Sequence, residues 1–228
     1  MVVADPSGAV APVSEDPQIL ARLQPMLASV AAQLDEVVGT APALLDGERP
    51  HVRAGDTNLA FLVTDAFRAA GGSELAFAIG GGIRSSIAAG EITYREVLTA
   101  LPFGNGLVRG KLSGAQVLEV LGLGARQVAP AGGWLQVSGL TWTIAGGEAR
   151  EVRIGGAALD PARLYSVTCD RFIADGGERY AHSYYNAPWL ATRGFDIAAA
   201  RAAVHAAAAL GNSLPWTVAE ATRPATSR

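Results

Sequence analysis

The sequence has few of the residues on which several common chemistries depend. Cys169 is the only cysteine among 228 residues, which excludes an internal disulfide and a cysteine-ligated zinc site. Lys111 is the only lysine and the net charge is −3, so the basic surface of a nucleic-acid-binding protein is absent. Positive charge therefore comes almost wholly from arginine, whose planar group suits carboxylate or phosphate.

Two targeting features are also missing from the sequence. No uninterrupted apolar run is long enough to span a bilayer, so we expect no membrane segment. The first residues, "MVVADPSGAVAPVSEDP", lack the basic region and the apolar region of a signal peptide. These features therefore do not assign the protein to a cellular compartment.

The three histidines give no indication of a metal site. His51, His182 and His205 are isolated in the sequence, and none stands in Asp-x-His or directly after Asn. Paired ligands for two metal ions, as di-metal phosphoesterases require, thus have no candidate. Nothing like the G-x-S-x-G elbow of a serine nucleophile occurs either. We therefore predict no catalytic residue and no metal ligand.

The residues that are present predict helices mixed with β-strands. Asp16 and Pro17 are suited to begin a helix whose apolar residues recur at helical spacing to Val38, where Gly39 ends it. A second helix is capped by Asp56 or Thr57 and ends at glycines 71 and 72. Further helices follow the capping boxes at 93–96 and 113–116, and a last one is expected at 196–210. Strands are predicted at 74–79, 106–112, 135–144 and 164–170, with a hairpin-like excursion at 145–156. This pattern indicates a mixed α/β structure of the α+β class.

The stretch "AFAIGGGIRSSI" (76–87) ends an apolar strand in three glycines and then presents Arg84. Its backbone N–H groups and guanidinium could face an anion, but it matches neither G-x-G-x-x-G nor a phosphate-binding loop. By itself the stretch favours a structural turn over a phosphate site.

Two phenylalanines occur in loops next to predicted strands. Phe103 lies in "LPFGN" (101–105), and Phe172 follows a strand in "CDRFIADGGERY" (169–180). In isolation such rings usually cover the edge of a core. The alternative is that both rings stack on a planar ligand such as a nucleoside, with a nearby carboxylate for the ribose. Sequence spacing alone does not show that the two loops meet.

Four segments together resemble the C-terminal domain of the 5'-nucleotidase and UDP-sugar hydrolase family. They are "RAGDTNLAFLVTDAFR" (53–68), "GGGIRSSIAAGEITYREVLTALPFGN" (80–105), "GWLQVSGL" (133–140) and "RFIADGGERY" (171–180), in the family's order. Residues 15–41 resemble the helical linker between the family's two domains. The likeness covers roughly residues 12–223. It implies the family's mixed α/β domain, preceded by a long linker helix.

The resemblance implies that the domain binds the nucleoside part of a substrate. The family's two base-stacking phenylalanines match Phe103 and Phe172, and the arginines that face the nucleotide match Arg53 and Arg84. Asn105 matches a polar contact near the base. In this reading the three glycines turn the strand end tightly and let the ligand approach, while Arg84 touches it.

Five residues depart from the family's pattern, of which Asp56 for Glu and Ala60 for Gly are milder changes. Ile79 replaces a polar residue before the glycines, which we interpret as the loss of a hydrogen bond near the sugar. Glu178 stands where Asp is expected and would still accept from ribose hydroxyls. Arg179 stands where glycine is usual. It would pair with Glu178, block the pocket or add an anion contact.

In the family, catalysis belongs to an N-terminal metallophosphoesterase domain with two divalent metal ions, for which this sequence has no ligands. We therefore expect a nucleotide-binding domain of a 5'-nucleotidase-type hydrolase that is not active alone. The alternatives are a half-enzyme completed by a separate metallophosphatase chain, and a degenerate structural or interaction domain. Residues 1–15 are interpreted as a remnant of the N-terminal domain, 16–50 as the linker helix and loop, and 51–228 as the binding domain. The family resemblance also implies a periplasmic or extracellular location.

Overall fold

The computed structural model describes residues 2–4, 10–12, 15–175 and 177. The chain divides into two compact units, residues 1–36 and residues 37–228. The helix predicted at 196–210, two of the histidines, Glu178 and Arg179 lie outside the described residues.

The first unit contains a short strand pair and one long helix. Strand β1 (Val2–Ala4) pairs antiparallel with β2 (Val10–Pro12), and helix α1 covers Pro17–Leu34. The Asp16 carboxylate accepts hydrogen bonds from the backbone N–H groups of Gln18 and Ile19, at 2.8 and 3.3 Å. The predicted start of this helix is thus confirmed. No side chain of α1 is buried.

The predicted end of this helix at Val38 is wrong. Helix α1 ends at Leu34, and the two valines that follow belong to strand β3 (Val37–Ala41). This strand pairs antiparallel with β5 (Gly90–Thr93), which joins Val37 to Thr93 and Gly39 to Ile92. The consecutive β-branched residues fit a strand better than a helix, and this long-range pairing outweighs the helical spacing.

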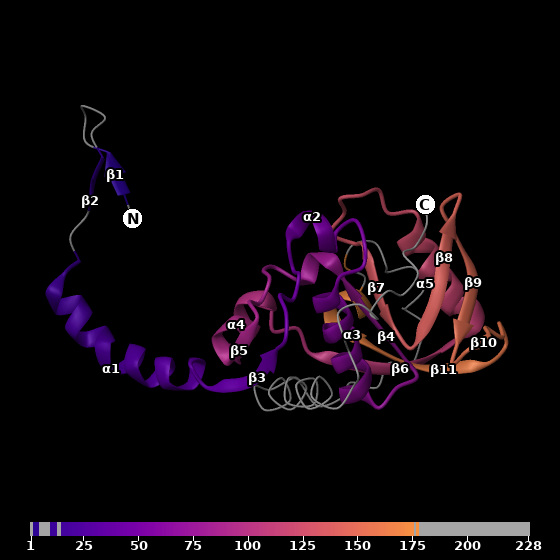
Figure 1. Ribbon diagram of the computed structural model, residues 1–228, viewed down its shortest axis with the longest axis horizontal. Helices are drawn as coiled ribbons and strands as arrows, with labels where there is room; N and C mark the ends of the chain where they lie inside the picture. The colour runs from indigo at the N-terminus through magenta and orange to yellow at the C-terminus, as the bar shows by residue number, and fades with distance from the viewer. Residues whose placement is uncertain (1, 5–9, 13–14, 176, 178–228) are drawn as a thin grey trace. The chain divides into compact units, whose positions relative to one another are not determined.

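The centre of the second unit is a four-stranded mixed sheet in the order β6-β11-β4-β7 (Figure 1). Strand β11 runs parallel to β4 and antiparallel to β6, while β7 runs antiparallel to β4. The strands are β4 (Leu75–Ile79), β6 (Leu107–Ser113), β7 (Leu135–Ser138) and β11 (Leu164–Asp170). Strands β4, β7 and β11 lie within segments predicted as strands, and β6 is shifted by one residue from its predicted segment at 106–112.

One face of this sheet is covered by helix α3 (Asn58–Gly71). The helix begins at the Thr57 cap and ends at Gly72, which is left-handed with φ 55°, so its prediction is confirmed. Every residue of β4 is buried because both faces of the sheet are covered. The small side chains of Ala76 and Ala78 alternate with the large residues of the opposite face, which brings α3 close to the strand.

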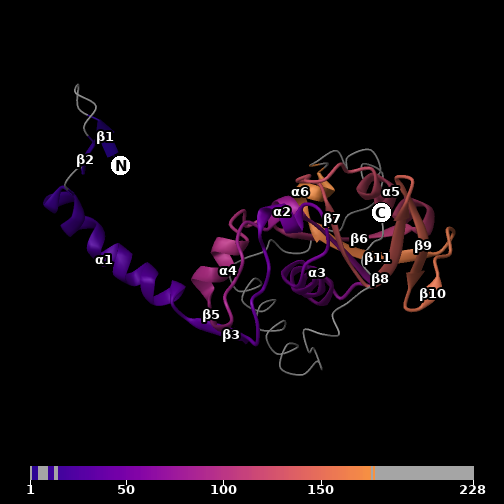
Figure 2. The same ribbon diagram turned by 45° about the horizontal axis from the view of Figure 1, so that its top comes forward.

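The opposite face packs against helix α5 (Gly114–Ala125) and a three-stranded sheet in the order β10-β9-β8. Strands β8 (Leu140–Ala145), β9 (Glu148–Ile154) and β10 (Ala157–Ala158) lie beside α5 in both views (Figures 1 and 2). The main hydrophobic core lies here. Phe77 from β4, Leu121 from α5 and Tyr165 from β11 are among its fully buried side chains.

Both predicted capping boxes are present. Thr93 caps α4 (Tyr94–Ala100) with Glu96, and Ser113 caps α5 with Gln116, each with the reciprocal pair of bonds. Two further short helices, α2 (Arg49–Val52) and α6 (Arg171–Ala174), were not predicted. Both carry or adjoin residues of the candidate site.

Candidate functional site

The three glycines form a single 3-10 turn, η1 (Gly80–Gly82), at the end of β4. The N–H of Gly80 donates to the Trp134 carbonyl at 2.8 Å, and the N–H of Gly81 donates to the Gly132 carbonyl at 2.7 Å. A Cβ atom on Gly80 would lie only 1.9 Å from the Val52 carbonyl oxygen. The first two glycines are therefore required by backbone contacts within the protein, and both N–H groups are used there. The prediction of a structural turn is confirmed.

Around Gly82 the space is open, since a Cβ atom there would meet no atom within 4 Å. Arg84 follows two residues later and is exposed, with its backbone N–H bonded to the Ala100 carbonyl at 2.9 Å. Its guanidinium donates to the Gly81 carbonyl at 3.4 Å, and its Cζ lies 5.8 Å from the centre of the Phe103 ring. The structure thus brings two of the predicted site residues together in a cation–π contact.

Arg53 lies at the same end of β4 as the glycine turn, but it belongs to a different segment of the chain. It is the residue directly after α2, and it is half-buried. Its carbonyl accepts from the N–H of Ala131 at 2.9 Å, while the preceding carbonyl of Val52 faces Gly80. Segments 52–53, 80–84 and 131–134 are therefore fixed to one another through their backbones.

The two phenylalanine loops adjoin, which sequence spacing did not show. The N–H of Arg171 donates to the Gly106 carbonyl at 2.7 Å, and the pairing of β6 with β11 places Leu107 opposite Asp170. Phe103 remains 59% exposed and Phe172 remains 45% exposed. The two aromatic side chains thus lie in neighbouring loops and neither is covered by the core.

Asp170 is a buried carboxyl group at the base of both loops. It caps α6 and accepts a hydrogen bond from the N–H group of Ile173 at 2.9 Å. Burial raises the pKa of the Asp170 carboxyl above its ordinary value, although the hydrogen bond from the Ile173 N–H and the polar groups of Asn105 and Phe172 oppose that rise. Only 8% of the residue is exposed.

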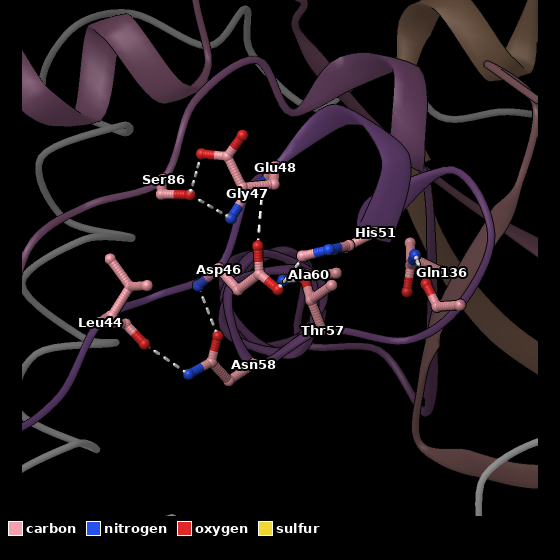
Figure 3. Close-up of polar contacts among 11 residues, drawn as sticks. Leu44, Asp46, Gly47, Glu48, His51, Thr57, Asn58, Ala60, Ser86 and Gln136 are labelled. Carbon is pink, nitrogen blue, oxygen red and sulfur yellow. Dashed lines mark hydrogen bonds and ion pairs between the residues drawn. The ribbon is translucent and has the colours of Figure 1, made fainter. Parts of the chain in front are cut away.

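Figure 3 shows a polar network that the sequence analysis did not single out, in segments that adjoin the two arginines in the sequence. Asn58 accepts from the Asp46 N–H at 2.7 Å and donates to the Leu44 carbonyl at 2.8 Å. Ser86 accepts from the Gly47 N–H and donates to Glu48, both at 3.0 Å.

His51 also belongs to this network, because its Nδ1 lies 2.7 Å from the carboxylate oxygen Oδ2 of Asp46 (Figure 3). Gly47 allows the close approach, because a Cβ atom there would lie 2.2 Å from the Ser85 carbonyl oxygen. The network joins the segment before Arg53 to the segment after Arg84. The sequence signal that could have indicated this network is the Asp-Gly pair at 46–47, which is typical of a turn.

A family model described as the C-terminal domain of 5'-nucleotidase matches residues 37–183, which is more than half of the chain. The chain belongs to this family. The UshA protein of Yersinia enterocolitica is 37% identical to the 5'-nucleotidase C-terminal domain described here over 168 residues, 74% of this chain and 30% of its own length. UshA of Escherichia coli is 32% identical over 183 residues, 80% of this chain and 33% of its own length.

Solved structures agree with this assignment. The 5'-nucleotidase precursor of Thermus thermophilus superposes with a TM-score of 0.73 at 30% identity, covering 90% of this chain and 46% of that one. The NAD nucleotidase of Haemophilus influenzae, at 17% identity and a TM-score of 0.63, shares the fold. The chain spans about a third of the length of the curated relatives that it matches.

The structure places Ile79 in the main core of this C-terminal domain. Its side chain is 3% exposed and belongs to the main core, together with Leu135 on the neighbouring strand. The isoleucine therefore fills a core position and offers no side-chain surface to a ligand.

Within the part of the chain that the structure describes, no three His, Cys, Asp or Glu side chains are grouped so that they would hold a metal ion. The described helices include none that is long and apolar enough to cross a membrane.

Proposed function

We propose that the chain is the nucleotide-binding domain of a 5'-nucleotidase-type phosphoester hydrolase and does not hydrolyse its substrate alone. Phe103 and Phe172 would stack on the base, and Asn105 would offer a polar contact at its edge. Arg84 and Arg53 would face the ribose or the phosphate. The observation that carries this proposal is that both exposed rings lie in adjoining loops, with a guanidinium beside one of them.

The chemistry of these groups supports a nucleotide over a purely apolar ligand. Aromatic rings stack on any base, and each stacked ring contributes about 1–3 kcal/mol in nucleic-acid-binding sites. An arginine next to the stacking ring provides positive charge for the attached phosphate, in a planar geometry that suits its oxygens. Glu178, six residues after Phe172 in the sequence, would accept from the ribose hydroxyls.

Hydrolysis would require a metallophosphoesterase domain that carries two divalent metal ions. The full-length relatives are about three times as long as their match to this chain. We propose that residues 16–50 connect the binding domain at 51–228 to that further domain, and that residues 1–15 are part of it. The break between compact units at residues 36 and 37 lies within the proposed connection.

Calorimetric titration with AMP and adenosine tests the binding proposal. We expect Phe103→Ala and Phe172→Ala each to weaken binding by about 1–3 kcal/mol, or roughly fivefold to 150-fold. Leu164→Ala is the matched control, because Leu164 is also 59% exposed but lies at the far end of β11. No binding at millimolar ligand, or equal affinities for all four proteins, would contradict the proposal.

A phosphatase assay tests whether substrate binding and hydrolysis belong to separate domains. The chain alone should not release phosphate from AMP with Mn²⁺ or Zn²⁺ present, and adding a metallophosphoesterase domain from a relative should restore release. Activity of the chain alone would show that the catalytic residues lie within it. Binding without activity in both arms would favour a binding or interaction domain.

A further inference from the structure

Gln136 is a fully buried amide in strand β7 (Figure 3). Its Nε2 donates to the Val52 carbonyl at 3.1 Å and to the Gly55 carbonyl at 2.9 Å. These two carbonyls belong to one short segment, here called the Arg53 turn (residues 52–55). We propose that Gln136 is a positioning residue, which holds the Arg53 turn in the place where Arg53 meets a ligand. The part of the proposal that concerns ligand affinity rests on the proposed function.

Bonds from distant segments hold the Arg53 turn. Within the turn, the N–H of Gly55 donates to the His51 carbonyl at 3.0 Å. The Arg53 carbonyl accepts from the N–H of Ala131 at 2.9 Å. With the two bonds from Gln136, three carbonyls of the turn accept from residues more than 70 positions later in the sequence. Two of these three bonds use the two N–H donors of a single amide.

The Val52 carbonyl also connects the Arg53 turn to the glycine turn η1. A Cβ atom on Gly80 would lie 1.9 Å from the Val52 oxygen, so the two backbones approach each other closely. Arg84 follows η1 by two residues. Because Gln136 bonds the oxygen at this contact, its amide holds the Arg53 turn against the segment that carries the second arginine of the proposed site.

The place of Gln136 in the sheet would otherwise suit an apolar side chain. Gln136 lies opposite Ala78 in the pairing of β4 with β7, on the face that helix α3 covers. Its Oε1 is buried, and no group in the described part of the chain donates to it. A buried oxygen without a donor lowers stability, so packing alone does not explain an amide here. The two bonds to the Arg53 turn do explain it.

Ser138 provides a matched control on the same strand. It is also fully buried, and it faces α3 because it stands two residues after Gln136 in β7. Its hydroxyl donates to the Asp65 carboxylate and accepts from Nε of Arg68, both in α3. Ser138→Ala therefore removes buried polar bonds between β7 and α3 but no bond to the Arg53 turn. A general loosening of β7 should appear in this variant as well.

Hydrogen exchange without ligand tests the positioning. Gln136→Met keeps an unbranched side chain of similar length but removes both donors. We therefore expect amide exchange in residues 53–55 to accelerate by about tenfold or more. Gln136→Asn keeps the amide but is one methylene shorter, so it should show a smaller acceleration in the same residues. In Ser138→Ala, exchange at 53–55 should stay within about threefold of the wild type. Unchanged exchange there in Gln136→Met, or equal acceleration in Ser138→Ala, would overturn the proposal.

Titration with AMP supplies a readout that a purely structural role would not move. Because Gln136 acts through Arg53, Gln136→Met and Arg53→Ala should each weaken binding by about fivefold or more. The loss in the double variant should be smaller than the product of the two single losses, since both changes remove the same interaction. Ser138→Ala should bind AMP as the wild type does.

The outcomes of the titration separate this proposal from the proposed function. Losses that multiply in the double variant, or an affinity loss in Ser138→Ala equal to that in Gln136→Met, would overturn the positioning role. If Gln136→Met does not fold, Gln136→Asn decides the question by the same two readouts. If the wild type binds no AMP, the proposed function fails, and hydrogen exchange at 53–55 alone decides whether Gln136 holds the Arg53 turn.

Discussion

The glycine turn allows a sharp test, because two neighbouring glycines differ in one physical respect. A Cβ atom on Gly80 would lie 1.9 Å from the Val52 carbonyl oxygen, whereas ordinary contact begins at 3.4 Å. A Cβ atom on Gly82 would meet nothing within 4 Å. Neither residue has the positive φ that would itself disfavour alanine. Comparing the stabilities of the two alanine variants therefore measures how much folding depends on the close approach of Gly80 to the Val52 carbonyl.

We expect Gly80→Ala to reduce the free energy of unfolding by about 3 kcal/mol. Overpacking a rigid contact costs about 1–3 kcal/mol, and moving the turn also weakens the Gly80 bond to the Trp134 carbonyl, worth about 1 kcal/mol. For a domain of this size the loss corresponds to a fall in Tm of about 10 °C. Gly82→Ala should instead be neutral or stabilising by up to about 1 kcal/mol, because alanine restricts the unfolded chain.

Urea unfolding followed by tryptophan fluorescence, with thermal unfolding beside it, measures both variants against the wild type. Equal stabilities for Gly80→Ala and Gly82→Ala would refute the reasoning that backbone packing demands the first glycine. The turn would then have to be explained by contact with a ligand.

Three further outcomes follow from the described contacts. Asn58→Ala removes the bonds to Asp46 and Leu44, so urea unfolding should show a loss of about 2 kcal/mol. Burial raises the pKa of the Asp170 carboxyl above 3.8, so folding favours its protonated form. Wild type should therefore gain stability relative to Asp170→Asn as the pH falls from 7 through the raised pKa towards 3.8, and lose it again as the pH rises; urea midpoints across that range check the sign. Burial also raises the pKa of the Cys169 thiol, so a disulfide reagent should label it only after unfolding.

Local sequence signals predicted those elements whose ends depend on neighbouring residues. Thr93 and Ser113 formed the expected capping boxes, and Thr57 and Gly72 bounded the second helix, because caps act within one turn. The end of α1 was missed because Val37 and Val38 continue the helical spacing but belong to β3, which pairs with β5 about 50 residues away. No local pattern reports such a partner.

The candidate site likewise has features that short sequence segments predict and features that depend on long-range pairing. Arg53, Arg84 and the two phenylalanines could be picked out from motifs, since each stands in a short segment of characteristic composition. That the loops of Phe103 and Phe172 meet depends on the antiparallel pairing of β6 with β11. In the sequence Asp170 is only the last residue of a predicted strand, because its burial arises from that pairing.

A crystal structure of this chain with bound adenosine tests the central claim most directly. The account predicts an ordered base between the rings of Phe103 and Phe172, with the Arg84 side chain on the side of the ribose C5' atom. Adenosine bound elsewhere, or two rings that remain without a base at saturating adenosine, would contradict it.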